Sequence, residues 1–208
     1  KEELSKMFTD LKGERVQLII PLKGKNKELV DLASRNAESL LEKKAETQSP
    51  LSEIKKILGL EIVPGRIEGF DISNIGGEES VGSLVVFEKG APLKDDYRKY
   101  KIKTVTGADD VRSLQEVVRR RYSRLLEEEK ELPDLILVDG GKGQLNAARR
   151  ALEELGIGQL PLVSLAKKEE IIFTPSRKNG IRLERTSPAL KLFQNIRDEA
   201  HRFALSFH

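Results

Sequence analysis

Two apolar runs in this chain each lead to an aspartate, and this pattern constrains the fold more than any other feature. One run is RIEGFDISN, which carries Asp71, and the other is LILVDGGKGQ, which carries Asp139. A carboxylate at the end of a buried strand is costly to remove from water, and two such groups in one site repel each other. If the strands are neighbours in one sheet, the two aspartates meet and need a cation between them. Mg²⁺ or Mn²⁺ would serve, and a metal held this way commonly cuts or joins phosphodiesters.

Composition bounds the class of protein. The 208 residues suit one domain or two, and 34% of them are charged, which predicts a heavily solvated surface. The absence of cysteine excludes disulfides, a thiol nucleophile and zinc–thiolate sites, and is typical of a reducing cytoplasm. No apolar run is long enough to span a membrane. The sequence begins at Lys1 without a signal peptide or an initiating Met, so we expect a cytoplasmic fragment of a longer protein.

Hydrophobic periodicity predicts the order of the elements. A short strand is expected at 15–20, an amphipathic helix at 26–46 and a second helix from Pro50 to Leu58. The core is then expected as strands 67–72, 81–87 and 97–103, a helix from 109, strand 135–138, helix 142–155, strand 162–166, a hairpin of 170–173 with 181–183, and a helix from Pro188 to about Phe207.

Three antiparallel strands, a helix and then a parallel strand flanked by helices is the order of the RNase H-like α/β fold, a mixed sheet covered by helices. In that order the first and fourth strands lie side by side, which would make Asp71 and Asp139 neighbours. We expect residues 1–64 to form a lead-in packed on the core, and residues 65–208 to form the RNase H-like domain.

The surroundings of the two aspartates allow structural readings as well. Asp71 shares a strand face with Gly69 and Ser73, and Gly69 leaves room for a ligand or a close backbone. Asp71 is too far from Gly76-Gly77 to cap that turn easily. Asp139 opens a glycine loop before a helix, so it either caps that helix or joins Lys142 and the helix N-terminus at a phosphate. The loop lacks the Walker A spacing, because Gly143 follows Lys142.

Three other features carry charge or an imidazole. His201 lies on a polar seam of the last helix with Arg197 and Gln194, where a lone histidine is usually structural. Asp109 and Asp110 precede a helix and are explained by capping alone, although Asp110 is kept as a possible site residue. The segment from Tyr97 to Arg124 holds nine Lys or Arg against three acids. Its cluster Arg119, Arg120 and Arg121 is either a solvated face or a contact for phosphates.

Together, several motifs resemble the C-terminal half of the UvrC family, the nuclease component of the UvrABC excinuclease. They are GFDISN around Asp71, VGS with VVF, YRKYKI from Tyr97, Asp109-Asp110 before RRRY, LVDGGKGQ around Asp139 and RDEAHRF around His201. The resemblance implies an RNase H-like endonuclease that makes the 5′ incision in bacterial nucleotide excision repair. It also implies that Asp71, Asp139 and His201 form a catalytic triad around Mg²⁺ or Mn²⁺, with Asp110 as a further acidic residue. Many relatives carry His at the position of Asn74, so no role for Asn74 follows.

The resemblance further implies partners and contacts. The substrate would be damaged double-stranded DNA, with UvrB as a direct partner and UvrA as an indirect partner of the full-length protein. Lys142, Arg197 and the three arginines 119–121 would contact DNA phosphates. A non-catalytic DNA-binding module on the same fold, in which the acids only cap turns, is the alternative from another class. A Holliday-junction resolvase or transposase-like nuclease is the alternative among enzymes.

Overall fold

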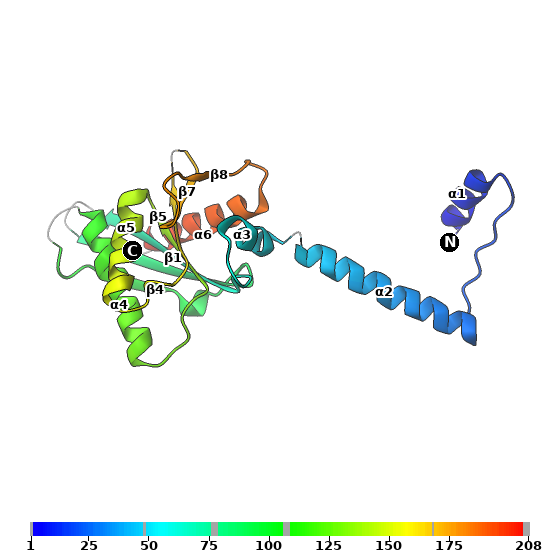
Figure 1. The fold of residues 1–208 in the computed structure, drawn as a ribbon, viewed down its shortest axis with the longest axis horizontal. Helices are drawn as coiled ribbons and strands as arrows, with labels where there is room; N and C mark the ends of the chain where they lie inside the picture. The colour runs from blue at the N-terminus through cyan, green and yellow to red at the C-terminus, as the bar shows by residue number, and fades with distance from the viewer. Residues whose placement is uncertain (1, 48, 76–78, 106–108, 168, 206–208) are drawn as a thin grey trace. The chain divides into compact units, whose positions relative to one another are not determined.

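The computed structural model describes residues 2–47, 49–75, 79–105, 109–167 and 169–205. Within these ranges, the side chains of 2, 38–47, 74–75 and 79–80 are left undescribed. The chain divides into two compact units, Lys1–Thr47 and Gln48–His208 (Figure 1). The predicted packing of residues 1–64 on the core, and the division at 64/65, stay predictions. None of the helices in the described ranges is long and apolar enough to cross a membrane.

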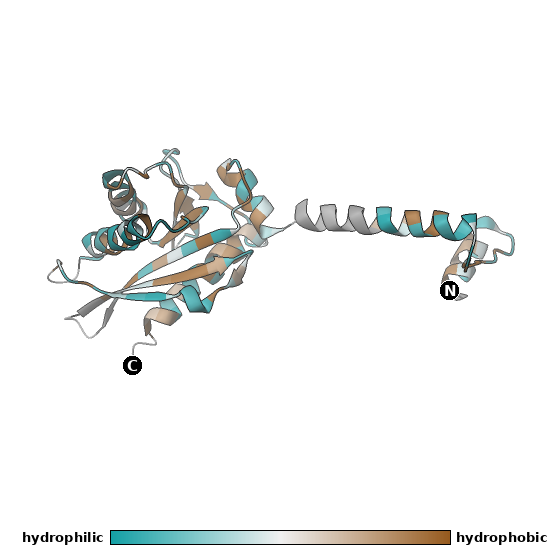
Figure 2. Ribbon diagram, turned by 90° about the horizontal axis from the view of Figure 1, so that it is seen from below, coloured by the Kyte–Doolittle hydropathy of each residue, from teal (hydrophilic) through white to brown (hydrophobic). Residues whose placement is uncertain are grey.

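The first unit consists of two helices, α1 (Glu2–Lys12) and α2 (Lys25–Thr47), and teal and brown residues alternate along the described part of α2 (Figure 2). The helix predicted at 26–46 is confirmed. The strand predicted at 15–20 is wrong, because that segment is irregular. Side chains of α1 take the place of a partner strand: Ser5 donates to the Val16 carbonyl, and the Val16 N–H donates to Thr9 Oγ1 at 3.0 Å.

The second unit is built on one mixed sheet in the order β3-β2-β1-β5-β6-β7-β8, with β4 also paired to β2. The strands are β1 (Arg66–Ile75), β2 (Glu79–Glu88), β3 (Ala91–Pro92), β4 (Arg98–Lys101), β5 (Leu135–Asp139), β6 (Leu162–Ala166), β7 (Ile171–Phe173) and β8 (Ile181–Arg182). Strands β1 and β5 are adjacent and parallel, and β1, β2 and β4 form the antiparallel group. The expected mixed sheet and the neighbouring first and fourth long strands are confirmed.

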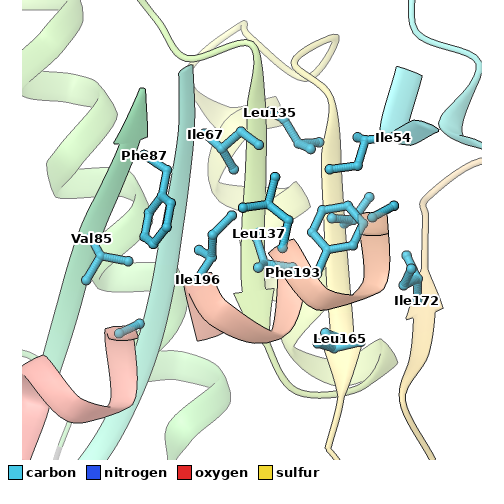
Figure 3. Packing of buried hydrophobic residues seen from close by; sticks show 14 of the residues in the cluster. Ile54, Ile67, Val85, Phe87, Leu135, Leu137, Leu165, Ile172, Phe193 and Ile196 are labelled. Carbon is cyan, nitrogen blue, oxygen red and sulfur yellow. The ribbon is translucent and has the colours of Figure 1, made fainter. Parts of the chain in front are cut away.

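Helices cover both faces of this sheet (Figure 1). On one face, α6 (Pro188–Leu205) and α3 (Pro50–Leu58) pack on a core that includes Ile67, Leu137 and Phe193 (Figure 3). On the other face, α4 (Asp110–Glu127) and α5 (Lys142–Glu154) pack on a core that includes Phe70 and Val138. A short 3-10 turn, η1 (Lys94–Asp96), precedes β4. Alternation along β1 therefore sends residues 67, 69 and 71 toward α6, and residues 68, 70 and 72 toward α4.

Local signals set the helix ends. Ser49 caps α3 by accepting from the Ser52 N–H, Pro50 occupies the first turn, and Gly59 ends the helix with a φ of 70°. The predicted end of α6 at Phe207 lies outside the described residues, as does the predicted turn at Gly76-Gly77.

Gly69 fixes how closely α6 approaches β1. A Cβ at this position would lie 2.4 Å from the Ile196 Cγ2 atom, so only glycine allows the contact. The space that the sequence predicted beside Asp71 is therefore taken by α6, which brings the helix onto the strand that carries Asp71.

Candidate active site

Asp71 and Asp139 occupy matching positions on neighbouring parallel strands. The β1–β5 register pairs Phe70 with Val138, and the two aspartates are the next residues on each strand. Ile67 lies on the same face of β1 as Asp71, and Leu137 lies on the same face of β5 as Asp139. Both apolar residues pack in the core on the α6 side of the sheet, so both carboxylates face α6. The sequence prediction that the two residues share one face of the sheet is confirmed.

The two carboxylates affect each other electrostatically. Asp71 is buried, with 5% of its surface exposed. Burial, and then the negative charge of Asp71, raise the pKa of Asp139 to about 6, while Arg197, Lys167 and His201 lower it. The site therefore disfavours a second negative charge, which is the property expected of a pair that shares a cation.

His201 reaches this pair from α6. Its Nδ1 atom lies 3.2 Å from Asp71 Oδ2, and its side chain is 44% exposed. The same Asp71 oxygen accepts a hydrogen bond from Ser73 Oγ at 2.7 Å. Asp71 is thus fixed from its own strand and from α6, and the histidine for which sequence reasoning favoured a structural role faces the site.

Ser83 ties the strands to α6 next to this contact, and sequence reasoning missed its role. Its buried hydroxyl donates to the Ala200 carbonyl at 2.8 Å and lies 3.5 Å from the Asp71 carbonyl. Ala200 directly precedes His201, so this hydroxyl holds the α6 backbone next to His201 and lies beside the backbone of Asp71. The available signal was the register, because Ser83 lies directly opposite Asp71 in the antiparallel β1–β2 pair.

Arg197 lies one turn before His201, and its positive charge is shared among acids. The guanidinium is buried and forms ion pairs with Glu170 at 3.0 Å and with Asp198 at 2.8 Å. Arg197 also lowers the pKa of Asp139, so its charge acts on the carboxylate pair. Its predicted contact with a DNA phosphate stays a prediction.

The glycine loop after Asp139 leads directly into α5. Gly140 has a φ of 130°, and a Cβ there would lie 2.7 Å from the Gln144 side chain, whose Oε1 accepts from the Gly141 N–H. The first turn of α5 therefore begins beside Asp139. Lys142 is exposed, but its ammonium donates to the Lys178 carbonyl at 3.1 Å. Its predicted phosphate contact also stays a prediction.

Asp110 begins α4, and Asp109 caps that helix by accepting from the Arg112 N–H at 3.0 Å. A Cβ at Gly143 would lie 3.7 Å from the Val111 side chain, so the first turns of α4 and α5 lie side by side. Asp110 is thereby placed at the same edge of the sheet as Asp139. Its role stays a prediction, and the Asn74 side chain lies outside the described residues.

The arginine cluster of α4 divides between the interior and the surface. Arg121 is drawn into the interior by an ion pair of 2.6 Å with the fully buried Glu68. Arg120 contacts Glu116 at 2.9 Å and donates to the Lys101 carbonyl, whereas Arg119 is exposed. The three belong to a helix on the face of the sheet opposite to Asp71, and their DNA contacts stay predictions.

The donor set fits a divalent cation in type and in charge. Asp71 and Asp139 offer oxygen ligands of the kind that Mg²⁺ and Mn²⁺ prefer, and their mutual repulsion favours a cation. In the described part of the chain, no group of three or more Asp, Glu or His side chains is arranged to hold a metal ion. The imidazole is instead hydrogen-bonded to Asp71, so the fit rests on the carboxylate pair.

Comparisons with known proteins show the family to which this chain belongs. The family described as the UvrC RNAse H endonuclease domain matches residues 55–205, and the UvrC Ribonuclease H-like domain matches residues 1–44. The chain belongs to the UvrC RNase H endonuclease family. UvrABC system protein C of Acidobacterium capsulatum is 47% identical over 214 residues, which cover 100% of this chain and 33% of that protein. The protein of the same name from Methanosarcina acetivorans is 44% identical over 208 residues, which cover 100% of this chain and 40% of that protein.

The chain therefore spans 33% and 40% of the length of these two relatives. Among solved structures, endonuclease V of Ciona intestinalis in complex with DNA matches 79% of this chain and 97% of its own, at 12% identity and a TM-score of 0.42. Human ENDOV matches 50% of this chain and 46% of its own, at 21% identity and a TM-score of 0.34. Family membership identifies the mixed sheet as RNase H-like and the chain as a nuclease domain.

Proposed function

We propose that this chain is the metal-dependent nuclease centre that makes the 5′ incision in nucleotide excision repair by the UvrABC system. The observation that carries the proposal is the pair of aspartates in register on β1 and β5, Asp71 buried and Asp139 half-buried, with His201 hydrogen-bonded to Asp71. Membership of the UvrC family and whole-chain relatives named UvrABC system protein C support it.

Asp71 and Asp139 would hold Mg²⁺ or Mn²⁺. When bound, such a metal lowers the pKa of a water molecule and neutralises charge on the phosphate in the transition state. The protein contributes the placement of the ligands: β1 and Ser73 fix Asp71, while β5 and the glycine loop fix Asp139. Ser83 holds the α6 backbone next to His201. A metal-ligand role for His201 stays a prediction.

His201 would assist by proton transfer. Asp71 engages its Nδ1 atom, which leaves Nε2 as the ring nitrogen that can accept or donate a proton on the substrate side. The contact with Asp71 would hold the imidazole ring in the orientation that presents Nε2. Arg197, held by Glu170, adds positive charge beside the carboxylate pair, where the phosphate would approach.

The substrate and partners that we propose are those of the whole system. Damaged double-stranded DNA would be cut, UvrB would bind the full-length protein, and UvrA would act through UvrB, all in the cytoplasm. The support is the family and the name shared by the relatives.

The test is made in a full-length protein that contains this chain. Asp71→Asn and Asp139→Asn are each expected to abolish Mn²⁺-supported 5′ incision of damaged DNA while the 3′ incision and the fold persist. The control is Asp95→Asn, which removes an exposed carboxylate in η1 and should leave both incisions intact. Retained 5′ incision by either site variant refutes the proposal. Preferred cutting of four-way junctions would indicate a resolvase instead, and DNA binding with no metal-dependent cutting would indicate a binding module.

A further inference from the structure

Lysines on the edge strand β4 share a face of the sheet with Asp71. The register pairs Asp71 with Ser83 across β1–β2, and Ser83 with Lys99 across β2–β4. Directly opposed residues in antiparallel strands point to the same face. Lys99 is therefore in one row with Asp71, two strands away, which is about 10 Å at the usual strand spacing. The next row on this face holds Ser73, Val81 and Lys101.

Contacts with α6 connect this lysine row to the site. The Lys99 ammonium lies 4.6 Å from the centre of the Phe203 ring, and the Tyr97 ring lies 5.1 Å from the same ring. Phe203 follows His201 by two residues on α6. Lys99 is thus beside the turn of helix that carries the histidine of the site.

A further lysine, Lys103, follows two residues after the end of β4. Lys101 and Lys103 are exposed and alternate with the half-buried Tyr100 and Ile102. Within β4, Lys99 and Lys101 are about 7 Å apart. The backbone at the far end is fixed by the buried carboxylate of Glu116, which accepts from the Lys103 N–H at 3.0 Å and the Thr104 N–H at 2.9 Å. The lysines are therefore presented by an anchored backbone.

The opposite face of the sheet does not offer the same approach to Asp71. It is covered by α4 and α5, and two arginines of α4, Arg120 and Arg121, are engaged by the buried acids Glu116 and Glu68. A phosphate that reaches Asp71 must come to the α6 side, where the lysine row extends the site outward.

We propose that Lys99, Lys101 and Lys103 form a phosphate-binding row for the DNA strand that enters the candidate active site. This inference rests on the proposed function, because it takes DNA as the substrate of the same site. The contact is to the backbone of the strand, so it adds affinity for every sequence alike.

The experiment measures binding of the full chain to a fluorescently labelled DNA duplex as a function of salt, without divalent metal so that no cutting occurs. The variant is Lys101→Gln/Lys103→Gln, and the control is Arg112→Gln/Arg124→Gln, which removes two exposed cations from α4 on the opposite face. Each lost phosphate contact reduces the slope of log K against log salt by about 0.9. The lysine variant should lose close to two such contacts and bind roughly tenfold more weakly.

The control should keep the wild-type slope, and Lys101→Arg/Lys103→Arg should restore it, because arginine keeps the charge. An unchanged slope in the lysine variant, or a larger loss in the α4 variant, overturns the inference. Circular dichroism melting shows whether the lysine variant is folded. If it is not, the comparison of Lys101→Arg/Lys103→Arg with the wild type decides, because that variant keeps both positive charges. Failure of the proposed function would be seen in a different measurement from failure of this inference. It would appear as retained 5′ incision by Asp71→Asn, whatever the salt slopes are.

Discussion

Two buried carboxylates on strand β1 lie three residues apart and face opposite sides of the sheet. Glu68 faces α4 and is fully buried, and it is neutralised by Arg121 at 2.6 Å, by Arg66 at 3.7 Å and by a hydrogen bond from the Tyr122 hydroxyl at 3.0 Å. Asp71 faces α6, and among the described residues its ion-pair partner is His201 rather than Lys or Arg.

Under the proposed function, this difference distinguishes a structural charge from a charge that takes part in the reaction. A buried carboxylate that is fully paired by the fold has no capacity left for a ligand. Asp71 is held by a serine and an imidazole and lies beside a second carboxylate, so the fold positions it without neutralising it. The pair Asp71 and Asp139 therefore favours a cation, whereas Glu68 completes a core.

The largest contrast is expected in catalysis. Asp71→Asn should lower 5′ incision by about a thousandfold or more, because loss of one metal ligand removes several kcal/mol of transition-state stabilisation. Its melting temperature should stay close to that of the wild type, since the change relieves repulsion with Asp139. Incision assays and calorimetry on the same preparation test this, and a destabilised Asp71→Asn protein with normal incision below its melting point would assign Asp71 the structural role of Glu68.

On the other face, the expected effect is on stability. Arg121→Ala should lower the free energy of unfolding by about 3–5 kcal/mol, because it leaves Glu68 buried without its main partner. Arg119→Ala, the exposed neighbour two positions earlier, should change it by no more than about 0.5 kcal/mol. Urea unfolding of both variants makes the comparison, and equal midpoints would show that the Glu68–Arg121 pair contributes nothing to the core.

A pH dependence is expected from Asp139. Burial and the charge of Asp71 raise its pKa from 3.8 to about 6, so the folded state binds this proton more tightly than the unfolded state. The metal-free protein should therefore lose stability as the pH rises from about 4 to about 6, by about 1–2 kcal/mol from this group because solvent screens a half-buried carboxylate, and stay less stable above. The measurement is the free energy of unfolding of the wild type and of Asp139→Asn at pH 4 and at pH 7. The difference between the two proteins isolates the contribution of Asp139. A difference that does not vary with pH would contradict the raised pKa.

A smaller effect is expected for the Ser83 bridge. Ser83→Ala should cost about 1–3 kcal/mol of stability, because the Ala200 carbonyl loses a buried donor. It should also loosen the Asp71–His201 contact. The chain has two histidines, so NMR can follow the His201 ring in a His208→Gln background. Ser83→Ala should shift the His201 resonances, whereas Ser176→Ala, in an exposed turn, should leave them in place. Unmoved resonances would remove the positioning role of Ser83.

Much of the fold could be predicted from the sequence because each long element carries a local signal. The apolar run before Asp139, the cap at Ser49 and Pro50 and the periodicity of α2 are properties of neighbouring residues. The adjacency of Asp71 and Asp139 followed from the order of the strands. The irregular path at 15–20 could not be predicted, because the pairing of Val16 depends on Thr9, a side chain from another element.

The candidate site was harder to predict from the sequence, because it too depends on contacts between distant elements. Sequence patterns gave the aspartates, but the burial of Arg121 depends on Glu68 lying on the inner face of a strand 53 positions earlier. Likewise, the role of Ser83 depends on a helix 117 residues further along the chain. Long-range contacts of this kind leave no local trace in the sequence.

The most direct test of the account is a calorimetric titration of the chain with Mn²⁺ at pH 7.5. Wild type and the control Asp95→Asn should bind the metal with equal affinity, and Asp71→Asn and Asp139→Asn should each bind at least tenfold more weakly. Binding to the wild type should also weaken as the pH falls below about 6, where Asp139 takes up its proton. Equal Mn²⁺ affinity in all four proteins would contradict the claim that the two aspartates form one cation site.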